Sequence, residues 1–180
     1  MSGYKKVGKA AITITFKGNY TGAIKKTFQI KQAIPKKNKI YKSGKYQYKV
    51  TKSAAKGGTV ELKAPLKKTM TSVSVPSTVK INGYTFAVTS IGKNAFKNNN
   101  KMTKATIGGN VTKIGANAFS GCKKLKKITV VTKKLKSKSV GKNAFKNIYK
   151  KAVISVPKSK KKAYMKVFKG KGQKKTVKIK

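Results

Sequence analysis

Three copies of one short motif constrain the fold more than any other feature of this sequence. The copies are Ile91-Gly-Lys-Asn-Ala-Phe96, Ile114-Gly-Ala-Asn-Ala-Phe119 and Val140-Gly-Lys-Asn-Ala-Phe145. Their phenylalanines are 23 and then 26 residues apart. A period in the twenties is typical of a solenoid, in which each unit must stack on its neighbours to bury its apolar face. The sequence therefore predicts a repeat protein.

Apolar residues also recur at fixed offsets after each phenylalanine, which predicts the core of the stack. The expected core residues are Ile91, Phe96, Met102, Ile107, Ile114, Phe119, Leu125, Ile128, Val130 and Phe145. The third copy drifts, with Lys151 at the offset of Met102 and Leu125. Terminal repeats are often atypical, so this drift is consistent with the end of the tract. Cys122 lies within the second copy, where we expect a small buried thiol.

The segments before the repeats read as β-hairpins. Residues 11–16 and 23–30 alternate with period two around a turn at residues 17–19. Residues 46–50 and 59–62 form a second such pair around Gly57-Gly58, and residues 32–39 read as a linker. Asn82-Gly83 between two alternating runs favours a type I′ hairpin turn. Val73 and Val75 predict a short strand that ends at Pro76.

A helix and a strand are expected after the repeats. Pro157 suits a first helical position, and residues 163–168 present one apolar face. Gly170 and Gly172 would end this helix, and residues 176–179 read as a last strand. We expect these elements to cap the apolar end of the stack, as a solenoid requires.

The I/V-G-x-N-A-F motif followed by L-x-x-I-x-V resembles the BspA-like leucine-rich repeat of bacterial cell-surface proteins. Residues 18–30 resemble the closing hairpin of a bacterial immunoglobulin-like surface domain. The resemblance implies a β-rich leucine-rich-repeat solenoid with N-terminal β-hairpins and a helix-strand cap, and an extracellular module without catalytic residues that contacts other macromolecules. The expected domains are 1–39, the hairpin remnant with its linker, and 40–180, the repeat domain. The latter divides into a β cap at 40–90, repeats at 91–156 and a C-terminal cap at 157–180.

The charge balance is extreme, and it limits the chemistry that the chain can perform. There are 47 basic residues, all of them Lys, against the single acid Glu61 and no His, which gives a net charge of +46. General acid–base catalysis needs groups that titrate near neutral pH, usually His or a tuned carboxylate, and the chain has no His and no second acid to pair with Glu61. A zinc site would have Cys122 as its one candidate ligand, which is too few. We therefore expect no enzymatic activity, no cofactor and no metal. Members of the resembling family carry some acids, and supercharging by design produces the composition seen here.

The lysines recur at equivalent positions of the repeats, which predicts rows of cations. Counted from each phenylalanine, these are offsets one, five and eight. The candidate binding residues are Lys97, Lys101, Lys104, Lys123, Lys124, Lys126, Lys127, Lys146 and Lys150. Equivalent residues of stacked strands lie about 4.8 Å apart, where two unit charges in water repel by roughly 0.9 kcal/mol. A linear polyanion along the stack would relieve this repulsion.

The expected partner is therefore nucleic acid or another polyanion, such as a heparan-type glycan, teichoic acid or lipopolysaccharide, with an anionic membrane surface as a further candidate. Because lysine cannot offer the planar fork of arginine, we expect sequence-independent binding driven by counterion release. Tyr41, Tyr46 and Tyr48 would suit base stacking, but packing within strands is the commoner role of such tyrosines. Cell entry with nucleic-acid cargo would be an extreme consequence of the charge.

The alternative function is a surface adhesion or structural module that binds a specific protein, with the lysines serving solubility or attachment to an anionic cell wall. No run of residues is long and apolar enough for a membrane span, and the N-terminus lacks the apolar region of a signal peptide. We expect a monomer, whose parent protein is secreted or displayed on a bacterial surface.

Overall fold

The computed structural model describes residues 8–17, 22–30 and 32–180, and it divides into two compact units, Met1–Ile34 and Pro35–Lys180. In the first unit, β1 (Gly8–Thr15) pairs antiparallel with β2 (Ala23–Ile30). The first predicted hairpin is thus confirmed, although most of its predicted turn lies outside the described residues. The expected domain boundaries at residues 39, 90 and 156 remain predictions.

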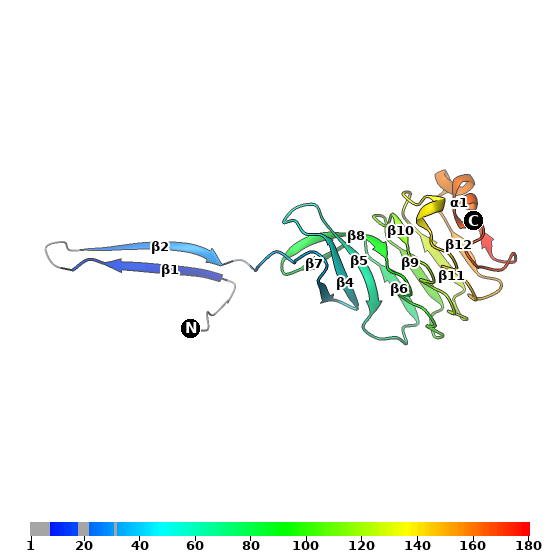
Figure 1. The fold of residues 1–180 in the computed structure, drawn as a ribbon, viewed down its shortest axis with the longest axis horizontal. Helices are drawn as coiled ribbons and strands as arrows, with labels where there is room; N and C mark the ends of the chain where they lie inside the picture. Colours follow the sequence, from blue (N-terminus) through cyan, green and yellow to red (C-terminus); the bar gives the residue numbers. More distant parts are fainter. Residues whose placement is uncertain (1–7, 18–21, 31) are drawn as a thin grey trace. The chain divides into compact units, whose positions relative to one another are not determined.

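The second unit begins with a mixed sheet (Figure 1). Its strands are β3 (Ile40–Ser43), β4 (Tyr46–Lys52), β5 (Gly58–Pro65), β7 (Thr78–Ile81), β8 (Tyr84–Ile91) and β10 (Lys113–Ile114). The predicted pairs β4–β5 and β7–β8 are antiparallel, as expected. Asn82 and Gly83 have φ angles of 51° and 77°, which are the positive values that a type I′ turn requires. The sequence did not predict β3, which pairs with β4 across the two-residue turn Gly44-Lys45.

A second sheet of unit 2 is entirely parallel and follows the repeats. Its strands in spatial order are β6 (Ser72–Val75), β9 (Lys104–Ile107), β11 (Lys127–Val130), β12 (Val153–Ser155) and β13 (Lys178–Ile179). Successive strands lie side by side along the unit in Figure 1. Ile128 is opposite Ala105 on one side and Ile154 on the other, so equivalent residues of successive repeats are register partners. The first residues of the three motifs are also neighbours, because Ile114 pairs with both Ile91 and Val140.

The Gly and Asn of each motif are needed for this close stacking. A Cβ at Gly115 would lie 2.5 Å from the backbone nitrogen of Lys93, and one at Gly141 would lie 2.4 Å from that of Ala116. The motif asparagines have left-handed φ angles between 55° and 59°; they are Asn94, Asn117 and Asn143. Asparagine tolerates this conformation better than most residues. The turn then directs the next Phe inward.

The motif phenylalanines form a continuous aromatic column through the core. Phe96, Phe119 and Phe145 are stacked, with ring centroids 5.2 Å and 5.6 Å apart. Tyr46 makes a T-shaped contact with Phe96 at one end, and Phe168 makes one with Phe145 at the other. All ten predicted core residues are buried. In the third repeat, the residue equivalent to Met102 and Leu125 is Ala152 and not Lys151, as counting from Phe145 had indicated. Lys151 is exposed, whereas Ala152 is fully buried. Its amide bonds to Tyr149 as that of Leu125 bonds to Cys122.

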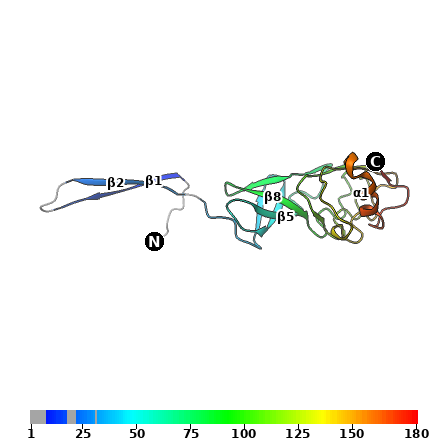
Figure 2. The ribbon, with the colours of Figure 1, turned by 90° about the horizontal axis from the view of Figure 1, so that it is seen from above.

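The C-terminal segment covers the end of the aromatic column. A 3₁₀ turn, η2 (Lys158–Lys160), leads into α1 (Lys161–Phe168), which is the one α-helix among the described residues. Figure 2 shows α1 at the opposite end of unit 2 from β5 and β8. The helix was predicted to begin at Pro157, but this residue only precedes the 3₁₀ turn. The predicted last strand is present as β13, although it is shorter than expected. A second 3₁₀ turn, η1 (Ser137–Ser139), lies between the second and third repeats.

Candidate functional site

Two rows of polar side chains cross the outward face of the parallel sheet. The first row contains Lys104 and Lys127, which are direct register partners on β9 and β11. Ser72 of β6 continues this row on one side. Neighbouring strands lie about 4.8 Å apart, so two ammonium side chains start from adjacent backbone positions. Both lysines are exposed and neither is in an ion pair with the acid of this chain.

The second row, two residues further along each strand, is made of hydroxyls. Its members are Ser74, Thr106, Thr129 and Ser155, which are register partners. Because alternate residues of a strand share a face, this row lies beside the lysine row. Hydroxyls both donate and accept hydrogen bonds. The sheet therefore presents cations beside hydroxyl groups, a combination that sequence reasoning did not identify.

All nine predicted binding lysines are exposed, but only some of them are shown to be neighbours. Lys101, Lys124 and Lys150 occupy equivalent turns before β9, β11 and β12. Lys97 and Lys146 follow the motif phenylalanines, with Ser120 at the equivalent position between them. Among the candidates of the second repeat, Lys126 lies over the ring of Tyr149 with Nζ 5.4 Å from the centroid. Lys104 and Lys127 are the pair that the register brings together.

The single acid of the chain lies on the other sheet. Glu61 is on β5, directly opposite Lys49, and its Oε1 is 3.5 Å from Nζ of Lys63. Lys63 is thus within ion-pair distance of the carboxylate, and Lys49 starts from the neighbouring backbone position on β4. Since the acid is on the mixed sheet, it leaves the charge of the parallel-sheet face uncompensated by any side chain of opposite sign.

The strand tyrosines and the cysteine are packing residues. Tyr46 and Tyr48 are buried, and burial raises the pKa of each hydroxyl above its ordinary value. Tyr46 also donates to the carbonyl of Ser74 (2.9 Å) and accepts from its amide (3.1 Å). Burial raises the pKa of the Cys122 thiol to about 11, and this thiol donates to the carbonyl of Phe96. These groups are not positioned for base stacking or for nucleophilic chemistry.

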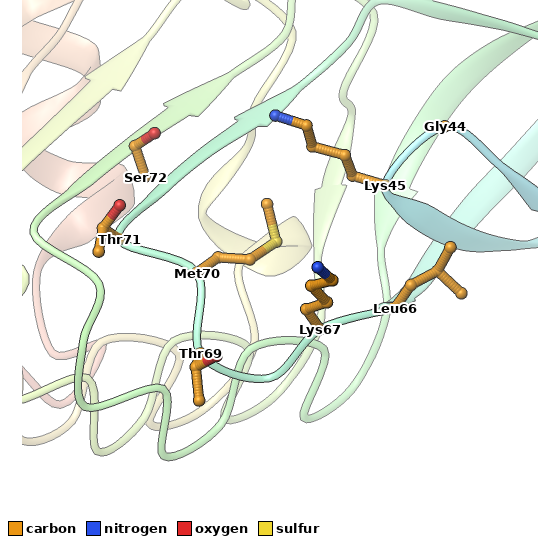
Figure 3. Close-up of a pocket in the computed structure, with 8 residues that line it drawn as sticks. All are labelled: Gly44, Lys45, Leu66, Lys67, Thr69, Met70, Thr71 and Ser72. Carbon is orange, nitrogen blue, oxygen red and sulfur yellow. The ribbon is translucent and has the colours of Figure 1, made fainter.

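A pocket of about 500 Å³ opens where the mixed sheet meets the first strand of the parallel sheet (Figure 3). It is lined by Gly44, Lys45, Leu66, Lys67, Thr69, Met70, Thr71 and Ser72. In Figure 3 the side chains of Lys67 and Met70 extend toward each other, whereas the side chain of Lys45 extends away from Lys67. Sequence analysis missed this pocket because its residues come from two separate segments without any motif.

The described residues include few side chains of the kinds that bind metal ions, and their one α-helix has eight residues. Among these residues, no group of three or more His, Cys, Asp or Glu side chains could hold a metal ion. No helix in the same part of the chain is long and apolar enough to cross a membrane.

The chain is similar to bacterial leucine-rich-repeat proteins of known structure. A leucine-rich repeat protein from Bacteroides capillosus matches with a TM-score of 0.54 and 22% identity, over 78% of this chain and 98% of that one. A leucine rich cell surface protein from Faecalibacterium prausnitzii matches with a TM-score of 0.51 and 22% identity, over 67% of this chain. Only 37% of the Faecalibacterium protein is covered. At this level of identity the two matches show the fold alone.

The family comparison agrees with the repeat geometry. No curated protein matches the chain. The family model described as the BspA type leucine rich repeat region (6 copies) matches residues 89–180, just over half of the sequence. This range contains the three motifs, the aromatic column and the C-terminal helix. The chain therefore belongs to the BspA-type leucine-rich-repeat family.

Proposed function

We propose that residues 40–180 form a leucine-rich-repeat solenoid that binds polyanions without reading their sequence. The observation that carries this proposal is the pairing of Lys104 with Lys127 on an outward sheet face of a chain with net charge +46. Two unit charges at the strand spacing of about 4.8 Å repel by roughly 0.9 kcal/mol in water. A polyanion lying across the strands removes this repulsion and releases its own counterions. The module acts as a monomer on a bacterial surface or in a secreted parent protein, and it is not an enzyme.

The salt dependence of binding tests this proposal. The logarithm of the affinity for duplex DNA or heparin should fall linearly with the logarithm of salt concentration, with a steep slope. Replacing both Lys104 and Lys127 with Gln should reduce the magnitude of the slope by about one for each phosphate contact that is lost. The double variant Lys42→Gln with Lys80→Gln is the control, because both lysines are exposed on the mixed sheet and the charge change is equal.

The results for the two double variants show whether binding depends on the parallel-sheet face or only on the net charge of the protein. An equal effect of both double variants would show that net charge alone, rather than the parallel-sheet face, governs binding. An affinity that barely changes between low and physiological salt would contradict polyanion binding altogether. Uptake into cells with nucleic-acid cargo is an extension of this proposal that the net charge supports.

A second candidate function is adhesion to a specific protein partner. The observation that favours it is the similarity to a cell surface protein of Faecalibacterium prausnitzii. In this case the lysines would serve solubility or attachment to an anionic cell wall. Changing all nine candidate lysines to Gln discriminates between the two functions. Retained binding of a protein partner would support adhesion, and loss of all binding would support the polyanion function.

A further inference from the structure

The pocket between the two sheets combines three kinds of group. Lys45 and Lys67 supply ammonium groups, Thr69, Thr71 and Ser72 supply hydroxyls, and Leu66 and Met70 supply apolar surface. Leu66 is 42% exposed, so apolar atoms face the solvent at the pocket wall. An isolated anion such as phosphate would use the ammonium groups and hydroxyls but not the apolar side chains. The lining therefore suits a ligand that carries a negative charge, hydroxyl groups and an apolar face together.

The walls of the pocket are held in place by hydrogen bonds outside it. The amide of Leu66 donates to the carbonyl of Lys45 at 2.9 Å, which ties the two segments together. The amide and hydroxyl of Thr103 both donate to the carbonyl of Thr71, at 2.8 Å and 3.2 Å. The hydroxyl of Tyr46, next to Lys45, bonds to both backbone groups of Ser74. Pre-formed walls reduce the entropy that a ligand must overcome on binding.

The pocket is continuous with the outward face of the parallel sheet. Ser72 lines the pocket and is also the register partner of Lys104, which in turn pairs with Lys127. The hydroxyl row that starts at Ser74 runs beside these residues. A polymer with one residue in the pocket could thus continue across the strands over cations and hydroxyls.

We propose that this pocket binds one uronic-acid residue of an anionic glycan. The ammonium groups of Lys45 and Lys67 pair with carboxylates of the glycan, the pocket hydroxyls bond to the ring hydroxyls, and Leu66 and Met70 contact the C–H face of the ring. The neighbouring sugars lie along the lysine and hydroxyl rows. This inference rests on the proposed polyanion binding and names the class of polymer. A peptide that ends in a carboxylate shares part of this chemistry, but it lacks the repeating hydroxyls that would follow the second row.

Binding of a short oligogalacturonate at physiological salt tests the proposal. The pocket variant is Lys45→Gln with Lys67→Gln, and the control is Lys161→Gln with Lys162→Gln on α1, which removes the same charge from exposed positions. We expect the pocket variant to bind the oligosaccharide at least about tenfold more weakly, since two charge-assisted contacts are lost. The control should stay within about twofold of the unchanged protein. Ser72→Ala, which changes no charge, should also weaken oligogalacturonate binding but not binding of duplex DNA.

Methyl NMR locates the sugar independently of any variant. In protein labelled at the methionine methyl groups, oligogalacturonate should shift the Met70 signal. Met102 in the core and Met165 on the exposed side of α1 serve as internal references. A neutral galactose oligomer should leave all three signals unchanged.

Several outcomes would overturn the pocket assignment. The first is an equal loss of oligogalacturonate affinity in the pocket variant and the control variant. The second is a Met70 signal that does not shift at saturating oligosaccharide. The third is a peptide with a free carboxyl terminus that competes for the pocket as well as the sugar does. If these occur while long polyanions still bind with a steep salt slope, the pocket fails and the proposed function stands. If the sugar result holds but the affinity for duplex DNA and heparin barely changes between low and physiological salt, the proposed function fails and the pocket stands.

Discussion

Phe119 is central to the packing of the repeats, because its ring stacks on Phe96 on one side and on Phe145 on the other. The side chain is fully buried. Its replacement by Ala would leave a cavity in the middle of the aromatic column. We expect Phe119→Ala to lower the free energy of unfolding by about 3–5 kcal/mol, measured by denaturant titration. Met165→Ala, at a side chain that is 54% exposed, should change it by less than about 0.5 kcal/mol.

Alanine variants at Gly115 and Gly109 test whether the motif glycine is needed for the close approach of successive repeats. A Cβ at Gly115 would meet the backbone of the preceding repeat at 2.5 Å, whereas one at Gly109 would be 3.5 Å from its nearest neighbour, the hydroxyl of Ser77. We expect Gly115→Ala to destabilise the fold by about 1–3 kcal/mol, because backbones must move apart. Gly109→Ala should be close to neutral. Equal thermal midpoints for the two variants would contradict the role of the motif glycine.

Cys122 links stability to pH above neutrality. Burial raises the pKa of its thiol to about 11, from an ordinary value of 9.0, so the unfolded chain loses its proton first. The unfolded state therefore binds fewer protons between pH 9 and 11, and stability falls as pH rises through this range. The variant Cys122→Ala lacks this group. The difference in unfolding free energy between the two proteins should shrink across that window, and a constant difference would contradict a buried neutral thiol.

At the scale of elements, the Tyr164 side chain of α1 forms hydrogen bonds with the loop that follows β11. The hydroxyl of Tyr164 donates to the carbonyl of Thr132 at 2.8 Å and accepts from the amide of Leu135 at 3.1 Å. Tyr164→Phe keeps the ring but leaves both backbone groups without this partner. We expect a loss of about 1–3 kcal/mol and faster hydrogen exchange at the Leu135 amide. Unchanged exchange at that amide would show that the hydroxyl does not hold the loop.

The hairpins show which elements local sequence could predict. Asn82-Gly83 specified its turn because both residues accept positive φ angles, and the flanking runs alternate. By contrast, β3 is a four-residue strand with no repeated pattern, and its place at the sheet edge depends on pairing with β4. Counting from Phe145 placed Lys151 at the position of the buried Met102 and Leu125, but Ala152 is the residue buried there. Burying the small apolar side chain avoids the large cost of burying an ammonium group.

At the scale of the whole molecule, self-repulsion is the main force that opposes folding beyond the usual chain entropy. A net charge of +46 favours expansion, and salt shortens the distance over which the charges interact, from about 30 Å at 0.01 M to about 3 Å at 1 M. We expect the thermal midpoint to rise with sodium chloride over this range. It should rise further with polyphosphate at low ionic strength, because a bound polyanion stabilises the folded state. A midpoint that is independent of salt would contradict this view of the charge.

The candidate site was predictable only in part. All nine candidate lysines are exposed. Lys104 and Lys127 share the offset of eight residues that predicted them in one row, and they are register partners. The position of Lys126 over the ring of Tyr149 was not expected. Lys126 precedes β11, so its side-chain direction is not fixed by the alternation of the strand, whereas Lys127 is the first residue of the strand.

The sequence by itself determined the repeat and its buried phenylalanines, because these depend on a spacing that is present in each copy of the motif. Only the tertiary structure decided that Ser72 would lie beside Lys45 and Lys67, and that Glu61 would lie on a different sheet from the lysine row. These neighbours are set by how the mixed sheet joins the first parallel strand. Such long-range pairing depends on the packing of both sheets together, and no local pattern in either segment encodes it.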